Sequence, residues 1–299
     1  MEQLFVILLT GLVIVAFVLI YRNREEAEAN LGYKIVGYYL LGAFTFRLNE
    51  YALPVGFVVF LLFFRPVKNI KTKQNSAYLG LAFYLLQLII PAVEEYIYEY
   101  PREVAASSSN MYEVPFTHEW TAIRDRIEID PRAHLEDFHA EYQKDGEIDR
   151  LSYKLVSRSA EGFIHYRIEY SPETKAYSIH RKKVGNEWGQ FDRTVLATRF
   201  FEVLDQAEVK QLSAKNGDEE NYLISDGEMT SYAVKKSQKY RIQGNEIKEL
   251  TNDELPIIGY SITTCGRAEM KTAAESTGSA TSHACERQID YFFDIDPIE

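Results

Sequence analysis

Cysteine is scarce in this chain of 299 residues, which contains only two. Two cysteines can form one disulfide at most, so a small disulfide-dense scaffold is excluded. Basic residues are also outnumbered, with 33 Lys and Arg against 44 Asp and Glu, and the formal charge of −11 argues against a broad basic surface for nucleic acid. The overall composition, 46% hydrophobic and 26% charged, excludes wholesale disorder and collagen.

The sequence also lacks the local signatures of several enzyme classes. It has no Gly-x-x-x-x-Gly-Lys phosphate loop, no Gly-x-Ser-x-Gly elbow, no His-Glu-x-x-His zinc motif and no Ser-x-x-Lys pair. Internal repeats and a regular alternation of strands and helices are absent as well. Because many catalytic sites have no local signature, these absences favour a non-catalytic role without excluding an enzyme. No cofactor is predicted.

The apolar residues are concentrated in the first third of the chain, and the acidic residues in the remainder. Residues 1–93 carry 8 basic and 5 acidic residues, so residues 94–299 carry 25 and 39. A helix needs about 20 apolar residues to cross a bilayer, and the first run begins without the basic residues of a cleavable signal peptide. We therefore expect four transmembrane helices in residues 1–93, at about 4–21, 31–48, 51–64 and 78–93.

The positions of the cations predict the orientation of these spans. Lys and Arg in short loops remain on the cytoplasmic side of a membrane, and the loop 65–73 has four of them. The last span then runs outward and places residues 94–299 outside the cytoplasm. Three spans are the alternative, with the short run 35–46 lying on or dipping into the outer leaflet. Both versions place the C-terminal region outside the cytoplasm.

Arg47 and Glu50 form a polar pair between two of the expected spans. On a helix, residues three apart share a face. One interpretation is therefore a buried ion pair in a conduction path. The other is a polar turn at the outer face of the membrane, which the neighbouring Asn49 and Pro54 favour.

The C-terminal region is expected to be an acidic extracytoplasmic α+β domain, residues 119–299, after a juxtamembrane segment and linker over 94–118. Alternation with period two predicts a largely antiparallel sheet, and a helix is predicted over 194–204. The predicted strands are 151–158, 162–170, 175–184, 222–225, 231–236, 239–243, 246–250, 256–264 and 288–295.

A further helix is predicted over residues 131–144. Asp130 and Pro131 are typical of an N-cap and of a first helical residue. Leu135, Phe138 and Tyr142 then recur at helical spacing, which predicts a buried stripe.

Cys265 and Cys285 stand at the ends of two expected strands, with a small polar stretch between them. A hairpin centred near Glu275 places the two cysteines opposite each other, and oxidation is permitted outside the cytoplasm. We therefore predict a Cys265–Cys285 disulfide, which stabilises the fold by about 3 kcal/mol in the chain-entropy model. Free thiols, or one reactive thiol, are the alternative.

A short segment that ends at Cys265 resembles a known enzyme family, and this resemblance favours the alternative with a reactive thiol. The segment Ser261-Ile262-Thr263-Thr264-Cys265 resembles the strand-end Thr-Cys of sortases, the extracytoplasmic cysteine transpeptidases, with Arg267 or Arg287 as the cationic partner. The resemblance implies that Cys265 is a nucleophile and that a histidine upstream shares its proton. The nearest upstream histidine, His180, is 85 residues away, which is longer than the pattern of that family.

Three other segments contain residue types that bind metals. His134 and His139 lie with three acidic residues in one predicted helix, but a separation of five residues points them about 140° apart rather than to one face. The acidic segments 216–221 and 226–227 lack the alternate carboxylates of a calcium loop. The histidine segment is therefore interpreted as a solvated helix face and the acidic segments as hairpin turns, and no metal site is predicted.

Taken together, these patterns predict an integral membrane protein whose acidic extracytoplasmic domain is a non-catalytic sensing, binding or assembly module of the cell envelope, with a bacterial membrane as the expected setting. The expected partners are the lipid bilayer and other envelope proteins. One alternative is an extracytoplasmic hydrolase or cysteine transpeptidase that uses Cys265. Another is a small-solute transport component in which Arg47 and Glu50 are essential.

Overall fold

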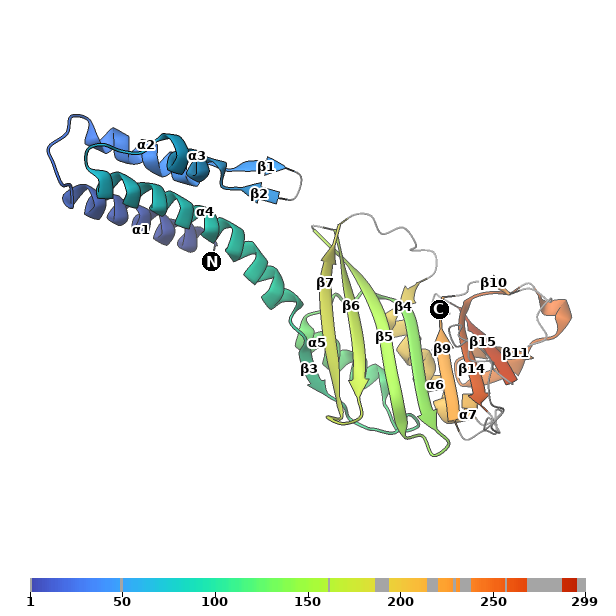
Figure 1. Cartoon of the computed structure of the whole chain (residues 1–299). Helices are drawn as coiled ribbons and strands as arrows, with labels where there is room; N and C mark the ends of the chain where they lie inside the picture. The colour runs from blue at the N-terminus through green and yellow to red at the C-terminus, as the bar shows by residue number, and fades with distance from the viewer. Residues whose placement is uncertain are drawn as a thin grey trace, which may run out of the picture. The chain divides into compact units, whose positions relative to one another are not determined.

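The structure is a computed structural model. It describes residues 2–48, 51–160, 162–185, 194–213, 220–227, 230–231, 238–255, 257–267 and 287–294. The chain divides into two compact units, Met1–Ile97 and Tyr98–Glu299, which are called the N-terminal unit and the C-terminal unit below (Figure 1).

The N-terminal unit consists of helices and one short hairpin (Figure 1). The apolar runs form the helices, and the polar residues between the second and third runs coincide with the hairpin. The helices are α1 (Glu2–Arg22), α2 (Leu31–Ala43), α3 (Val55–Phe63) and α4 (Ile70–Glu99). Strands β1 (Phe46–Leu48) and β2 (Tyr51–Leu53) pair in antiparallel fashion between α2 and α3.

The prediction of four, or three, transmembrane helices in this region is wrong. Among the described residues, α4 is the one helix long and apolar enough to cross a membrane, and the apolar helical stretch Ile7–Arg22 is shorter than such a span. Helix α2 has 13 residues and α3 has 9. They are therefore about 20 and 14 Å long, against a hydrocarbon core of about 30 Å. The cause is the β1–β2 hairpin, which takes residues away from the predicted spans 31–48 and 51–64.

Helices α2 and α4 approach closely through small residues. A Cβ atom at Gly42 would lie 2.1 Å from the carbonyl O of Ala77, and one at Gly80 would lie 2.2 Å from the carbonyl O of Tyr39. At the same contact, Ser76 donates a hydrogen bond of 2.6 Å to a backbone carbonyl of α2. Only residues without a large side chain allow two helix backbones to come this close. The packing of α2 against α4 therefore depends on both glycines.

A polar network holds the loop between α1 and α2 against the start of α4. The Glu28 carboxylate accepts hydrogen bonds from Lys34 Nζ at 2.6 Å, Asn69 Nδ2 at 2.9 Å and Lys73 Nζ at 2.9 Å. Asn69 Oδ1 in turn accepts two backbone N–H groups of the loop, at 2.9 and 2.8 Å. The hydrogen bonds from Lys34, Asn69 and Lys73 lower the pKa of Glu28 to about 2, so this carboxylate stays ionised at neutral pH.

The C-terminal unit is a mixed α+β domain built on one large sheet, which confirms the α+β part of the predicted fold class (Figure 1). In the described part of the chain the sheet has eleven strands in the order β12-β11-β15-β14-β9-β4-β5-β6-β7-β3, with β8 also paired to β4. Its pairings are antiparallel except that of β11 with β15. The strands are β3 (Arg102–Ala105), β4 (His134–Gln143), β5 (Ile148–Ser159), β6 (Gly162–Ser171), β7 (Ala176–Val184), β8 (Val195–Leu196), β9 (Glu220–Ser225), β11 (Gln238–Gln243), β12 (Glu246–Glu249), β14 (Tyr260–Arg267) and β15 (Arg287–Phe293).

Short elements complete this unit. Helices α5 (Phe116–Ile127), α6 (Ala197–Ala207) and α7 (Val209–Ser213) pack with the sheet, and a 3-10 turn, η2, covers Asn252–Glu254. Strands β10 (Thr230–Ser231) and β13 (Ile257–Ile258) form a separate small pair. Asp205 on α6 accepts hydrogen bonds from the first backbone N–H groups of α5, at 2.8 and 2.9 Å, and so caps that helix.

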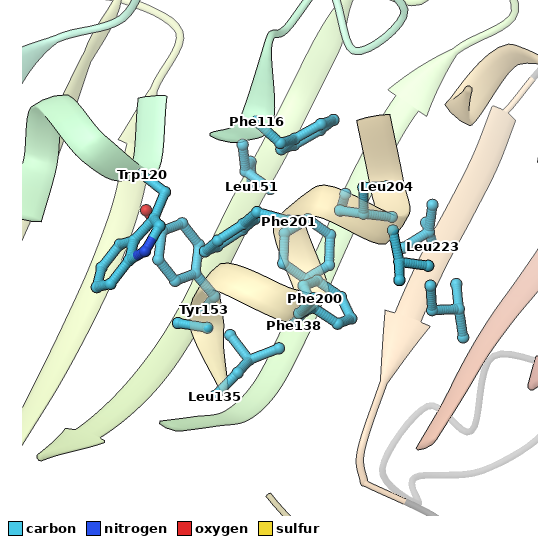
Figure 2. Close-up of a cluster of buried hydrophobic side chains, with 14 of the residues drawn as sticks. Phe116, Trp120, Leu135, Phe138, Leu151, Tyr153, Phe200, Phe201, Leu204 and Leu223 are labelled. Carbon is cyan, nitrogen blue, oxygen red and sulfur yellow. The ribbon is translucent and has the colours of Figure 1, made fainter. Parts of the chain in front are cut away.

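An aromatic core lies between α5, α6 and one face of the sheet (Figure 2). The ring of Phe138 lies 5.2 Å from Phe200 and 6.0 Å from Tyr153, and Phe116 stacks on Phe201 at 6.3 Å. Side chains along a strand alternate between the two faces, so the residues between these core positions point away from the helices. The opposite face of β4–β7 is therefore left for polar side chains.

The helix predicted over residues 131–144 is wrong, because the segment forms strand β4. A β-bulge between Leu135 and Asp137 adds one residue to the strand. Core positions therefore fall at Leu135 and Phe138, three residues apart, before the ordinary alternation resumes towards Tyr142. The bulge gives a strand the spacing of a helix, which explains the wrong prediction.

The predicted meander and the helix at 194–204 are confirmed, with small shifts of their ends. The meander is β5, β6 and β7, and the helix is α6, which starts at Ala197 after the short strand β8. The strand predicted at 231–236 lies mostly outside the described residues. Within the segment interpreted as a linker, β3 joins the edge of the sheet and α5 begins at Phe116.

Candidate functional site

The open face of β4–β7 carries a row of charged side chains that crosses four strands. The antiparallel register places Asp137 opposite Lys154, Lys154 opposite Arg167, and Arg167 opposite His180. All four residues alternate with core positions, so they point to the side away from α5 and α6. The two cations Lys154 and Arg167, together with the neighbouring His180, are called the cationic row below.

Without a compensating negative charge, the cationic row lowers the stability of the sheet. Lys154 and Arg167 stand directly opposite each other, and like charges in this position destabilise a sheet. Lys154 forms an ion pair with Asp137. Arg167 is exposed, and no described residue lies within ion-pair distance of its guanidinium. A sequence that breaks a local rule in this way is expected at functional positions.

A second row, next to the first, adds hydroxyl and carboxylate groups. His139, Ser152, Glu169 and Ser178 stand opposite one another across the same strands. The ring of His139 contacts the Glu141 carboxylate, with Nε2 2.6 Å from Oε1. Glu169 is exposed. The face therefore offers hydrogen-bond acceptors and hydroxyls beside the cationic row.

The β-bulge of β4 shapes one border of this face. Because it inserts a residue, it turns Glu136 as well as Asp137 to the open side. Glu136 Oε2 lies 3.4 Å from Nδ1 of His165 on β6. Three of the histidines in the described chain, His139, His165 and His180, thus share this face.

Two hollows meet on the cationic row. The first has a volume of about 430 Å³ and reaches from β9 and β4 to β6, and the second, of about 380 Å³, reaches from β4 to β7. Lys154, Arg167 and Glu169 line both hollows. These three side chains therefore lie where the two hollows adjoin.

The charge of this region is opposite to that of the domain around it. Residues 148–184 contain 8 Lys and Arg and 4 Asp and Glu, whereas residues 94–299 as a whole contain 25 and 39. A small cationic area on an acidic domain attracts anions locally and repels them elsewhere. The first hollow itself is lined by three cations, Arg150, Lys154 and Arg167, and by three carboxylates, Asp137, Glu169 and Asp226, so a ligand there would meet charges of both signs.

The candidate metal segments do not form a metal centre within the described residues. No group of three His, Cys, Asp or Glu side chains in that part of the chain could hold a metal ion. His134 and His139 lie on strand β4 instead of a helix. Asp226 lines the first hollow, and most of the segment 216–221 lies outside the described residues.

The two predicted residue pairs are only partly described. Cys265 is buried on β14, opposite Tyr222 and Gln288, and is not a free thiol, while Cys285 lies outside the described residues. The Cys265–Cys285 disulfide stays a prediction. Arg47 is exposed on β1, and Glu50 lies outside the described residues, so a pair between them also stays a prediction.

The comparison with known families concerns the C-terminal unit. A family model described as an archaeal family matches residues 117–292, which is more than half of the chain. The chain belongs to this archaeal family. The segment that matches the archaeal family begins in α5 and ends in β15, so it includes the open face of β4–β7 and excludes α1–α4. No curated protein and no solved structure matches the chain.

The histidine at the start of β4 predicts a pH dependence of stability. Burial lowers the pKa of His134 below its ordinary value of 6.5. Below pH 6.5 the unfolded chain then binds more protons at this position than the folded chain, so the free energy of unfolding falls as the pH decreases. We expect this fall, measured by urea denaturation between pH 7.5 and 5.5, to be smaller in His134→Gln. Equal falls in the two proteins would contradict the assignment to His134.

Proposed function

We propose that the protein is a membrane-anchored, non-catalytic binding protein, and that its C-terminal unit holds an anionic ligand on the open face of β4–β7. The proposal rests on Arg167. This guanidinium lies where the two hollows meet, opposite another cation, and no described residue pairs with it. A negatively charged group on a ligand would compensate the positive charge of Arg167, which no described residue of the sheet does.

The surroundings of Arg167 restrict the ligand further. Ser152 and Glu169 stand in the neighbouring row and line the same hollow. A serine hydroxyl donates and accepts hydrogen bonds, and an ionised carboxylate accepts them. The best match is therefore a molecule with an anionic group for Arg167 and Lys154 and with hydroxyl groups beside it. Acidic carbohydrates have this chemistry.

Membrane anchoring is supported by the apolar surface of the N-terminal unit. Large apolar side chains are exposed along all four of its helices, and exposed apolar patches of this extent mark a surface that contacts a membrane or another protein. They include Ile7, Leu8, Leu12, Ile14, Val15, Val18 and Leu19 on α1, Leu61, Leu62 and Phe63 on α3, and Leu85, Leu86, Leu88, Ile89 and Val93 on α4. A bilayer around these helices would cover this surface.

The side of the membrane follows from the charges around α4, the one described helix that could span it. Arg65, Lys68, Lys71 and Lys73 lie at or just before its N-terminal end. Cations next to a span remain on the cytoplasmic side. We therefore propose that the C-terminal unit, which follows the other end of α4, lies outside the cytoplasm.

The binding proposal is tested with the full chain in detergent micelles. Isothermal titration is expected to show binding of oligogalacturonate, which carries carboxylates and hydroxyls, and none of the uncharged maltohexaose. Arg167→Gln removes a charge-assisted hydrogen bond of about 1.5–3 kcal/mol, so the affinity should fall about 10- to 100-fold. Added salt should weaken the binding as well.

The matched control is Arg158→Gln. Arg158 is exposed on β5, like Lys154, but it lines neither hollow. Its replacement should leave the affinity unchanged. Equal affinities of the wild type and Arg167→Gln, or equal losses in both variants, would contradict the proposed site.

A further inference from the structure

A groove between α1 and α2 in the N-terminal unit has a volume of about 660 Å³. Apolar side chains from the last turns of α1 and from the first turns of α2 form its walls, and polar groups gather at one end. The lining consists of Phe17, Val18, Tyr21, Arg22, Glu28, Asn30, Leu31, Gly32, Tyr33, Ile35 and Val36.

A glycine of α2, Gly32, is part of the lining of the groove. A Cβ atom built at Gly32 would meet nothing within 4 Å. In the same helix, Gly42 has the backbone of α4 directly against it. Gly32 therefore serves no close packing between helices, and its missing side chain leaves room along the wall of the groove.

The polar end of the groove has one cation available for a ligand. Arg22 is exposed at the last residue of α1, and no described residue lies within ion-pair distance of its guanidinium. Glu28, the acidic residue of the lining, is engaged by Lys34, Lys73 and Asn69 and so does not neutralise Arg22. Tyr21 and Tyr33 flank this end, as tyrosines do at the interface of a membrane with water.

We propose that this groove binds one phospholipid molecule, with an acyl or isoprenoid chain between α1 and α2 and its phosphate on Arg22. The inference rests on the proposed anchoring of the N-terminal unit in a membrane. An amphiphile fits because the groove has apolar walls along its length and an uncompensated cation at one end. Basic pockets between membrane helices bind anionic headgroups in this way.

The test fills the groove without disturbing the helices. Gly32→Leu adds a side chain where the protein leaves space, and Gly37→Leu is the matched control, because Gly37 is in the same helix, is equally open and does not line the groove. The full chain is purified in detergent, given phosphatidylglycerol in mixed micelles, and examined by native mass spectrometry for retained lipid.

The wild type and Gly37→Leu are expected to retain one phosphatidylglycerol per chain, and Gly32→Leu to lose it. Arg22→Gln should need at least about tenfold more lipid for the same occupancy, since a hydrogen bond to a charged group is removed. Inorganic phosphate should not displace the lipid, because it lacks the chain that fills the groove. Equal retention by the wild type and Gly32→Leu, or no retention by the wild type, would overturn the proposal.

Flotation with phosphatidylglycerol vesicles separates this inference from the anchoring on which it rests. A chain that floats but retains no lipid in the groove would overturn the lipid site alone. A chain that does not float would overturn the membrane anchor and the lipid site together. Gly32→Leu is expected to float like the wild type, because the exposed apolar surface of α1 and α4 remains.

Discussion

Replacing Phe200 by alanine is expected to lower the free energy of unfolding of the C-terminal unit by about 3–5 kcal/mol. Phe200 is fully buried on α6. Its ring lies 5.2 Å from Phe138 on β4, 6.0 Å from Tyr260 on β14 and 6.3 Å from Phe293 on β15. The side chain therefore contacts strands from both halves of the sheet, and its removal leaves a cavity that neither half can close alone.

The measurement is urea denaturation of the full chain, followed by near-ultraviolet circular dichroism, which reports the packing of the aromatic core. Gln206→Ala is the control, because Gln206 is exposed on the same helix and its replacement should change stability by less than about 0.5 kcal/mol. A cost below about 1 kcal/mol for Phe200→Ala would show that α6 does not hold the two halves together.

Replacing Gly80 by alanine is the second change with a large expected effect. The new Cβ atom would lie 2.2 Å from the carbonyl O of Tyr39 and 2.7 Å from the backbone N of Ala43. Because these are backbone atoms, α2 as a whole must move away from α4. Overpacking costs about 1–3 kcal/mol where side chains can yield, and we expect a loss at or above the upper end of that range.

The control for Gly80→Ala exploits the helix propensity of alanine. Gly37→Ala makes the same substitution in α2 at a position with nothing within 4 Å. Alanine favours a helix over glycine by about 1 kcal/mol, so Gly37→Ala should raise the melting temperature of the detergent-solubilised chain while Gly80→Ala lowers it. Shifts of the same sign in both variants would contradict the close contact between α2 and α4.

The sequence predicts those parts of the fold in which local pattern and tertiary structure agree. In β6, the alternation of Tyr166 and Ile168 with His165 and Arg167 is enough to identify the strand and its two faces. In β4 the bulge imitates a helical spacing, so the local pattern points to the wrong element. In the N-terminal unit, hydropathy locates the apolar runs, and the polar residues between the second and third runs indicate a turn. No local pattern predicts that strands β1 and β2 pair on either side of it.

The candidate site also depends on contacts between strands that a local sequence pattern does not predict. Alternation predicts that His165, Arg167 and Glu169 share one face. It does not predict that Lys154 and His180 stand beside Arg167, because that neighbourhood depends on the register of three strands. The available signal is compositional: residues 148–184 have an excess of cations within an acidic domain. That excess identifies the region of the site but not its central residue.

The parallel pairing of β15 with β11 has a consequence for the order in which the domain can assemble during translation. In the described sheet, β11 has β12 and β15 as its neighbours, so the β11–β12 hairpin reaches the other strands through β15. A hairpin alone is marginally stable in water. Since β15 follows every other described strand of the sheet in the sequence, this hairpin cannot take its native place in the sheet before β15 has been synthesised. The complete sheet therefore depends on its last strand, which pairs with β14 on one side and with β11 on the other.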